Sequence, residues 1–407
     1  MKKLLIITDD FLDLGGARSV AWQQALALRD KYSVTVFTAA DNVVQLDGVK
    51  IIQTKHRIPN KRRFKDNICF KPVVREFEHI LEEINPDIVH GHNLHKHLSL
   101  ACLRQAKLKG AKTFLTLHDT MWLTYGKFIS AVNPRDLSNQ PKVYYKIKLF
   151  NQLKQARFKF NPFRKNKILR LLPYIDQIFA VSDSLRKIYL SNGWSKIETL
   201  YNGIDISQWE KFSEINILNS KINFNNKHTL FFAQRLSKEK GIIQLTKAMK
   251  QIINKDPQAV LIIAGKERGF KQIITDIATT ELFNKHFIFL GEVDRSTIKQ
   301  VMHMVDVVVN PSIYPDPFNL VNIEAMACAK PVVGTCFGGT HEIVLDKKTG
   351  FIINPFNVNL LAEVCLKLLL DKSLRDKLGQ QGFLRVRDEF SLNKQLDMLS
   401  LKFYLNT

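Results

Sequence analysis

Two carboxylates eight positions apart lie where a strand, a loop and a helix are expected to follow one another. Asp316 falls in a proline-rich loop after the apolar run 306–310, and Glu324 falls about one turn inside the predicted helix 320–329. The free N–H groups at the start of such a helix present a positive end to an anion. Carboxylates beside an anion site are better placed to accept hydrogen bonds from sugar hydroxyls than to bind phosphate. The pattern therefore predicts a site for a sugar joined to a phosphate.

Two cations follow another expected strand, at 229–234. A departing nucleoside diphosphate carries about two or three negative charges that must be stabilised as the sugar leaves. The sequence has no D-x-D motif of the kind that holds a divalent ion. We therefore expect Arg235 and Lys240, with the helix start at 318–322, to take the place of a metal. The alternative is that both cations are ordinary surface charges in a lysine-rich region.

A Gly-Gly pair, Gly15 and Gly16, ends the loop after the first strand and opens a helix. Glycine in this context lets the backbone approach a phosphate closely. The pair is not a G-x-G-x-x-G fingerprint, and a simple tight turn fits the residues equally well. Asp13 just before it either faces a ligand or caps the turn.

His118 and Asp119 end an expected strand at the carboxyl edge of a sheet, where ligands bind in open α/β folds. A histidine there can hydrogen-bond a sugar and steady charge as a bond breaks. The alternative is a capping or structural pair, and Asp119 could either orient His118 or meet an acceptor hydroxyl. The histidine-rich run 90–97 lacks a carboxylate or thiolate at informative spacing, so we expect no metal site.

The stretch from Asp316 to Glu324, followed by Ala-Met-Ala and Pro-Val-Val, resembles the donor-site signature of family 4 glycosyltransferases, which are retaining enzymes of the GT-B fold. The segment 235–241 is similar to the G-R-L-x-x-x-K-G of the same family. Asp316 stands where Glu is usual, Asn319 where Gly follows the Phe, and Gln234 where Gly is usual. The ribose contact implied for Glu324 is therefore firmer than the sugar contact implied for Asp316.

The resemblance implies roles for individual residues. Gly16 would face the donor diphosphate, His118 the transferred sugar, and the segment at Val293 the nucleobase. The expected catalytic residues are His118, Asp119 and Asp316. The expected donor-binding residues are Gly16, Arg235, Lys240, Val293, Phe318, Asn319, Leu320, Val321 and Glu324.

Alternating strands and helices predict an α/β fold of two Rossmann-like, doubly wound domains that face each other across a cleft. Strands are expected at 3–8, 34–38, 88–90, 112–117, 177–181 and 197–201, and again at 229–234, 260–264, 287–290, 306–310, 331–334 and 350–353. Helices are expected between them, including 94–109. The predicted domains are 1–205 for the acceptor and 206–387 for the donor, with a linker near 200–225. The resemblance implies that 388–407 packs back on the first domain.

Charge is unevenly distributed along the 407 residues. The net charge is +22, and residues 1–200 hold 34 Lys and Arg against 17 Asp and Glu. A polyanionic partner is therefore expected, either an anionic lipid surface or a nucleic acid. Because no nucleic-acid recognition motif is visible, we expect no nucleic acid.

The insertion 125–170 is the most basic part of the chain, with no acidic residue between Asp136 and Asp176. Tyr145, Leu149, Leu153, Ala156 and Phe160 fall at helical spacing among ten cations. This composition suits a helix at an anionic membrane surface. The alternative is that the apolar stripe packs on its own domain.

The apolar run of the N-terminus, MKKLLIITDD, has only five residues and ends in two aspartates, so it predicts a strand rather than a signal peptide. No run approaches the ~20 apolar residues of a membrane-spanning helix. The five cysteines are scattered, as reduced thiols would be. These features predict a cytoplasmic protein.

We therefore expect a retaining transferase that moves a hexose from a UDP- or GDP-hexose to a lipid-linked saccharide or lipid acceptor, without metal or other cofactor. It would act at the inner face of the cytoplasmic membrane, in bacterial surface polysaccharide synthesis. The alternatives are another two-domain nucleotide-sugar enzyme, such as an epimerase or a phosphorylase, and a basic nucleic-acid-binding protein.

Overall fold

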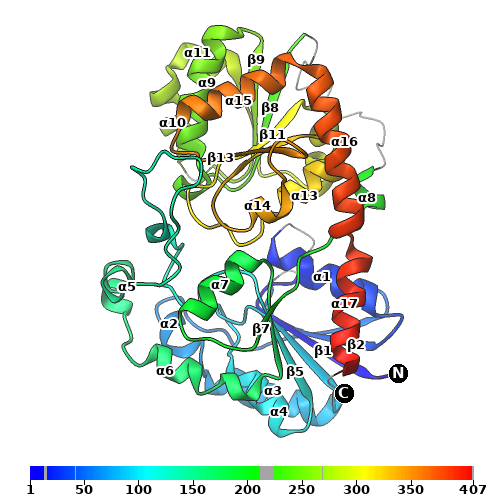
Figure 1. Cartoon of the computed structure of the whole chain (residues 1–407). Coiled ribbons are helices and arrows are strands. Elements are labelled where there is room, and N and C mark those ends of the chain that lie inside the picture. Colours follow the sequence, from blue (N-terminus) through cyan, green and yellow to red (C-terminus); the bar gives the residue numbers. More distant parts are fainter. Residues whose placement is uncertain (13–15, 42, 211–223, 225, 268, 406–407) are drawn as a thin grey trace. The chain divides into compact units, whose positions relative to one another are not determined.

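The structure is a computed structural model that describes residues 1–12, 16–41, 43–210, 224, 226–267 and 269–405 (Figure 1). The chain divides into two compact units. Unit 1 comprises residues 1–128, 145–202 and 393–407, and unit 2 comprises 129–144 and 203–392. The division after Asn202 falls three residues before the boundary expected from the sequence. The expected linker lies largely outside the described residues.

Unit 1 is built on a seven-stranded parallel sheet of order β3-β2-β1-β4-β5-β6-β7. Its strands are β1 (Lys3–Thr8), β2 (Ser33–Thr38), β3 (Val49–Gln53), β4 (Ile88–His92), β5 (Lys112–Leu117), β6 (Gln177–Ala180) and β7 (Ile197–Thr199). The order reverses between β1 and β4, as in a doubly wound fold, so ligands are expected at the carboxyl ends of these two strands.

Eight helices of unit 1 are described, together with two 3-10 turns. The helices are α1 (Ala17–Leu28), α2 (Arg63–Asp66), α3 (Lys71–Ile84), α4 (Ala101–Leu108), α5 (Leu149–Ala156), α6 (Arg164–Leu169), α7 (Asp183–Ser191) and α17 (Leu392–Leu405); the turns are η2 (Arg157–Lys159) and η3 (Leu172–Tyr174). Helix α17 ends the chain in unit 1. Its Phe403 packs against Phe114 of β5, with ring centroids 4.7 Å apart.

Unit 2 repeats the architecture with a six-stranded parallel sheet of order β10-β9-β8-β11-β12-β13. Its strands are β8 (His228–Ala233), β9 (Ala259–Ala264), β10 (Phe287–Gly291), β11 (Val307–Asn310), β12 (Val332–Thr335) and β13 (Gly350–Ile353). Here the order reverses between β8 and β11. The sequence prediction of two Rossmann-like domains is confirmed.

The described helices of unit 2 are α8 (Ser207–Glu210), α9 (Ile242–Lys255), α10 (Phe270–Ala278), α11 (Thr280–His286), α12 (Arg295–Met304), α13 (Leu320–Ala327), α14 (Thr340–Ile343), α15 (Val358–Leu370) and α16 (Lys372–Glu389), with 3-10 turns η1 (Ile129–Ala131) and η4 (Lys238–Lys240). Apolar residues of α9 recur at helical spacing, and Leu245, Met249 and Ile252 are fully buried in the core of this unit. Among the described residues, no helix has the length and apolar character needed to cross a membrane.

Three local predictions were wrong. Strand β3 was not expected, because it is a partly exposed edge strand rather than a buried run. Helix α4 starts at Ala101 instead of 94, since the carboxylate of Asp9 takes the N–H groups of Lys96, His97 and Leu98 at 2.7–2.8 Å and holds them in a loop.

The third concerns the insertion. Its helix covers only Leu149–Ala156, because Arg157 has a positive φ of 49° that ends it. Residues 129–144, expected in the first domain, cluster with unit 2. There the side-chain amide of Asn354 donates to the carbonyl oxygens of Asp136 and Ser138 at 2.7 and 2.9 Å.

Glycines let two loops of unit 2 pack closely behind the expected site. Gly241 has φ +77°, and a Cβ atom there would lie 1.8 Å from the carbonyl oxygen of Pro311. Gly338 has φ +71°, and a Cβ atom there would lie 2.1 Å from the carbonyl oxygen of Asp316. The loop 311–317 therefore depends on both glycines for its position.

We expect Gly241→Ala to lower the free energy of unfolding by about 3–5 kcal/mol, because both the positive φ and the clash with Pro311 oppose a side chain. Gly269→Ala is the matched control. Gly269 has φ +78°, but a Cβ atom there would meet no atom within 4 Å in the part of the chain that the structure describes, so only about 1–2 kcal/mol should be lost. Urea unfolding of both variants measures the difference, and equal losses would contradict the packing account.

Candidate active site

In unit 2, the side chains of Asp316 and Lys240 form a hydrogen-bonded ion pair. The Lys240 Nζ atom lies 2.5 Å from Oδ2 of Asp316, and the Ser312 hydroxyl donates to the same oxygen at 3.2 Å. Lys240 also lies over the Tyr314 ring, 5.8 Å from its centroid. Two residues predicted for different roles, sugar binding and phosphate binding, are thus brought together. Lys240 positions the carboxylate as well as supplying positive charge.

The start of α13 is capped by Asn319. Its side-chain oxygen accepts from the N–H of Val321 at 3.3 Å, and its backbone oxygen accepts from the N–H of Asn322 at 3.0 Å. Phe318 and Leu320 on either side are buried. Two of the N–H groups predicted to face an anion therefore already have acceptors.

Asn319 also belongs to a chain of buried side-chain amides. Its Nδ2 donates to Oε1 of Gln234 at 3.0 Å, Gln234 donates to Asn310, and Asn310 donates to Asn322. Gln234 follows β8 and Asn310 ends β11, so the chain joins the two strands between which the sheet order reverses. Sequence reasoning flagged Gln234 and Asn319 as departures but did not foresee that they meet.

Glu324 is buried inside α13 and faces a cation that sequence reasoning missed. Arg295, at the start of α12, places Nη2 3.9 Å from Oε1 of Glu324, and its guanidinium lies 5.1 Å from the centroid of the Trp209 ring. The sequence did contain one indication that Arg295 belongs to the site, because it lies two residues after Val293, in the segment expected at the nucleobase. Val293 itself is half-buried, and Arg235 is exposed directly after Gln234.

In unit 1, the carboxyl ends of β1 and β4 form a small pocket of about 60 Å³. It is lined by Thr8, Asp9, Asp10, Arg18, His92, Asn93, His95 and Lys96. The Lys96 ammonium lies 3.0 Å from both carboxylate oxygens of Asp10. The pocket lies where the strand order reverses, which is the position where doubly wound sheets bind ligands.

Asp119 is held by a histidine that is itself oriented. Arg63 donates from Nη2 to Nδ1 of His95 at 2.7 Å, so the other ring nitrogen of His95 carries the proton and donates to Asp119 at 2.9 Å. Burial alone would raise the pKa of Asp119, but the neighbouring His95 lowers it below its usual range. Asp119 is therefore an acceptor at neutral pH. Its partner is His95, and the alternative that it orients the His118 ring finds no support.

His118 belongs to a group of neutral histidines. Its Nε2 lies 3.0 Å from Nδ1 of His92, and His90 lies 2.8 Å from the Thr116 hydroxyl. Burial lowers the pKa of His118 to about 4 and that of His90 to about 3, and lowers the pKa of His92 strongly. His118 can therefore donate or accept a hydrogen bond at neutral pH without carrying charge.

Gly16 precedes α1 with φ +71°, and among the described residues no atom outside its chain neighbours would lie within 4 Å of a Cβ atom there. Asp13 and Gly15 lie outside the described residues. Among the described residues there is no group of three His, Cys, Asp or Glu side chains arranged to hold a metal ion.

Sequence comparison finds two family models that match successive parts of the chain. Residues 14–208 match the model of Glycosyltransferase Family 4, and residues 214–385 match that of Glycosyl transferases group 1. The uncharacterized glycosyltransferase MJ1607 of Methanocaldococcus jannaschii is 31% identical over 53% of this chain and 56% of its own length. The capsular polysaccharide biosynthesis glycosyltransferase CapM of Staphylococcus aureus is 28% identical over 53% and 57%. These matches thus span little more than half the length of either relative.

Structural comparison shows the fold. The structure of Anabaena Alr3699/HepE in complex with UDP and glucose aligns with 99% of this chain and all of its own, with a TM-score of 0.73 at 20% identity. Two doubly wound units that align with this structure show the GT-B fold. In the sequence, the Glycosyltransferase Family 4 model matches most of the first half of the chain, and the Glycosyl transferases group 1 model matches most of the second half.

The neutral histidines predict how stability depends on pH. Between about pH 4 and 6.5 the unfolded chain binds protons that folded His90 and His118 do not, so the free energy of unfolding should rise with pH in this window and level off above it. His90→Gln should reduce the slope by up to about 1.4 kcal/mol per pH unit. His79→Gln is the control, because His79 is exposed. Urea unfolding from pH 4.5 to 8 measures the slopes, and equal slopes would contradict this assignment.

Proposed function

We propose that this protein is a retaining hexosyltransferase that uses a nucleoside diphosphate sugar, a UDP- or GDP-hexose, and a lipid-linked saccharide or lipid acceptor. The observation that carries the proposal is the arrangement around α13, where Asp316 and Glu324 flank a helix start and Lys240 is bonded to Asp316. The Anabaena structure with UDP and glucose supports the donor class. The match to CapM supports a place in bacterial surface polysaccharide synthesis.

Unit 2 residues hold the donor in this proposal. Glu324 accepts from the ribose hydroxyls, with Arg295 keeping the carboxylate in place, and the backbone at Val293 contacts the base. Asp316 accepts from sugar hydroxyls, since a carboxylate has about four lone-pair sites and can serve Lys240 and a ligand together. Arg235, Lys240 and the α13 start (Phe318, Asn319, Leu320, Val321) stabilise the charge that develops on the diphosphate, so no metal is required.

Unit 1 residues serve the transferred sugar and the acceptor. Gly16 offers backbone to the diphosphate, His118 donates to the sugar as a neutral imidazole, and Asp119 accepts from the acceptor hydroxyl. The bond from the anomeric carbon to the diphosphate oxygen breaks while the acceptor oxygen bonds to the same face of that carbon. The leaving phosphate oxygen takes the acceptor proton, so no separate general base is needed.

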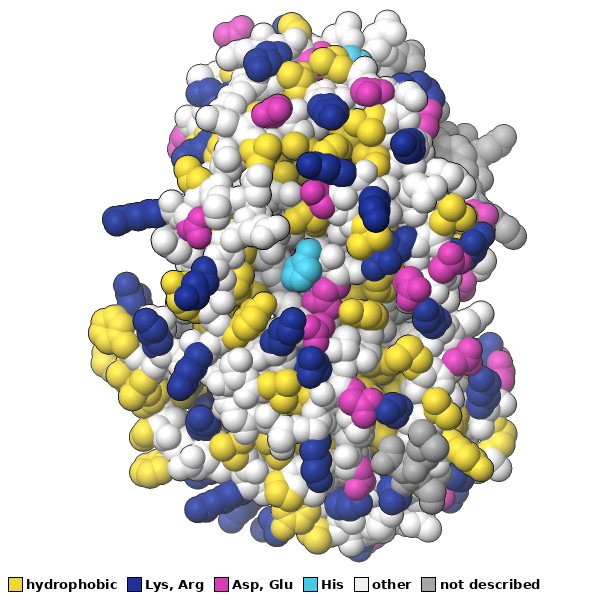
Figure 2. All heavy atoms as spheres, viewed as in Figure 1, with side chains coloured by type: hydrophobic (Ala, Val, Ile, Leu, Met, Phe, Trp, Pro, Cys, Tyr) yellow, Lys and Arg dark blue, Asp and Glu magenta, His cyan; other side chains and the backbone are white. Residues whose placement is uncertain are grey.

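The insertion supplies a surface suited to a lipid acceptor. Leu149 and Phe150 of α5 and Phe158 of η2 are 62%, 73% and 105% exposed, whereas Ala156 at the end of α5 is buried, so the first turn of α5 and the η2 turn present apolar side chains to solvent. Figure 2 shows hydrophobic side chains gathered beside Lys and Arg at the edge where Figure 1 places α5. Apolar side chains among cations suit the interface of an anionic membrane. The protein would then act on the inner face of the cytoplasmic membrane.

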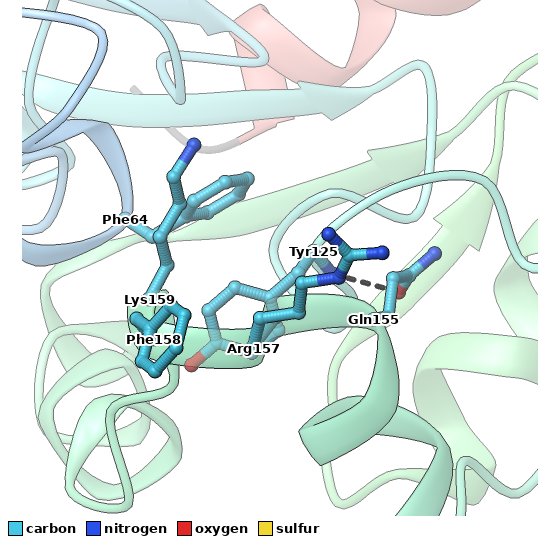
Figure 3. Close-up of a pocket in the computed structure, with 7 residues that line it drawn as sticks. Phe64, Tyr125, Gln155, Arg157, Phe158 and Lys159 are labelled. Atoms are coloured by element: carbon cyan, nitrogen blue, oxygen red, sulfur yellow. Dashed lines mark hydrogen bonds between the residues drawn. The ribbon is translucent and has the colours of Figure 1, made fainter.

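A pocket of about 300 Å³ opens beside this surface (Figure 3). Phe64, Tyr125, Arg157, Phe158 and Lys159 surround it, and the Tyr125 N–H donates to Gln155 at 3.1 Å. Rings and cations without a lining carboxylate suit a lipid that carries a phosphate. Behind the pocket, Arg164 is buried and donates to the carbonyl oxygens of Met121 and Trp122 at 2.8 and 2.7 Å, which anchors the insertion to unit 1.

We expect thermal shift with UDP, GDP, ADP, CMP and their sugar conjugates to identify one nucleotide that stabilises the protein equally with and without Mg²⁺. With that donor, Glu324→Ala and Lys240→Ala should lower kcat/KM at least about 100-fold, equivalent to about 2.7 kcal/mol of transition-state stabilisation. Glu363→Ala and Lys247→Ala, at exposed positions of the same unit, are the controls. Near-normal turnover by both site variants would overturn the assignment.

We expect Phe150→Ser combined with Phe158→Ser to weaken binding to vesicles containing phosphatidylglycerol at least about fivefold, because the double variant loses two apolar anchors. Leu108→Ser, at a position 59% exposed in α4 of the same unit, should leave binding unchanged. Co-sedimentation with vesicles measures both. Unchanged sedimentation of the double variant would refute the membrane role of α5.

A further inference from the structure

In the buried amide chain of unit 2, each side chain donates to the next in one direction, from Asn319 toward Asn322. One hydrogen bond sets this direction. Because the Val321 N–H is a donor, Asn319 must turn Oδ1 toward it and Nδ2 toward Gln234. Gln234 must then accept with Oε1 and donate with Nε2 to Asn310, which in turn donates to Asn322. All four side chains are at least 93% buried, so water does not compete within the chain.

This direction leaves a defect at the far end. Nδ2 of Asn322 is buried and has no hydrogen-bond partner among the residues that the structure describes. An unpaired buried donor is costly, and an unpaired carbonyl oxygen is tolerated more often. The amide chain is therefore stabilising at the Asn319 end, where it caps the helix, and destabilising at the Asn322 end, where a buried donor is unpaired.

Reversing every amide removes that defect with little movement of heavy atoms, since oxygen and nitrogen only exchange places. Asn322 would then donate to Asn310, Asn310 to Gln234, and Gln234 to Asn319. The reversal is unfavourable at the helix start, because Nδ2 of Asn319 would there face the N–H of Val321. Two donors 3.3 Å apart need an acceptor that lies beside them within reach of both, and an anion is such an acceptor.

We propose that a nucleoside diphosphate at the start of α13 selects the reversed direction, in which Asn319 donates its side-chain N–H to the phosphate beside the N–H of Val321. Gln234 is then a positioning residue, because it must reverse with Asn319 and keeps its amide paired in both states. The inference rests on the proposed function for its ligand, but not on turnover. It assigns one role to two residues that replace glycines usual in the resembled family.

The test is a double-mutant cycle read out by calorimetric binding of UDP and GDP, with unfolding measured alongside. Gln234→Gly leaves the amide of Asn319 without its partner, and Asn319→Gly removes the proposed donor to the phosphate, so each should weaken binding of the preferred nucleotide about tenfold. The double variant should bind about as weakly as Asn319→Gly alone, because Gln234 acts only through Asn319. Additive losses in the double variant, or single variants that bind normally, would overturn the proposal.

Asn319→Asp separates reversal from simple capping. Aspartate caps a helix as well as asparagine does, so stability should be kept, yet it cannot donate to a phosphate. Nucleotide affinity should fall at least about tenfold, and the loss should persist at 0.5 M salt, because position 319 is buried and salt screens mainly exposed charges. Unchanged affinity, or a loss that salt abolishes, would contradict reversal. Failure of the wild-type protein to bind either nucleotide would overturn both this inference and the proposed function.

Discussion

The hydrogen bond from Gln234 to Asn310 joins the ends of β8 and β11, the strands between which the order of the unit 2 sheet reverses. At such a point the crossover helices diverge and leave the strand ends open to a ligand. Polar side chains buried there must find partners within the protein, since an unpaired amide costs about 1–3 kcal/mol. The amide chain meets this requirement and ends on Asn319, which caps α13. The position of the helix start, and of Asp316 and Glu324 on either side of it, depends on that chain.

In both units, the carboxylates at the expected sites accept hydrogen bonds from donors that the fold holds in place. Asp9 accepts three backbone N–H groups, Asp119 accepts from His95, and Asp316 accepts from Lys240. A chain of net charge +22 offers many cations, but these contacts are short and lie at strand ends or in the loops that follow them. Such carboxylates are fixed in place as hydrogen-bond acceptors, which suits the recognition of hydroxyl groups. His90 and His92 are neutral for the opposite reason, because burial without an acidic partner lowers the pKa of each imidazole.

Sequence alone could predict the elements whose signals are local. Buried runs such as Leu4–Ile7 and Val260–Ile263 predicted the strands to within one or two residues, because a parallel strand covered on both faces is apolar throughout. The loop after Thr8 could not be predicted, since its shape comes from Asp9 bonding to backbone nearly ninety residues away. The edge strand β3 could not be predicted, because it contains no buried apolar run. In the site, residue types placed Asp316, Lys240 and Glu324, but the pairing of Lys240 with Asp316 and the approach of Arg295 to Glu324 depend on tertiary contacts.

The two replacements of glycine are best understood as one change. Asparagine alone at position 319 would cap the helix but leave Nδ2 buried without an acceptor, and glutamine alone at 234 would leave Oε1 buried without a donor. Together they satisfy each other at 3.0 Å, so the second replacement removes most of the cost of the first. Neither residue is adjacent to the other in sequence, and no periodicity links them. The sequence does carry one indication of the pairing. Gln234 and Asn319, which both replace glycines usual in the family, fall at the ends of elements that meet where the strand order reverses. At that place two side chains far apart in the chain are brought within hydrogen-bonding distance.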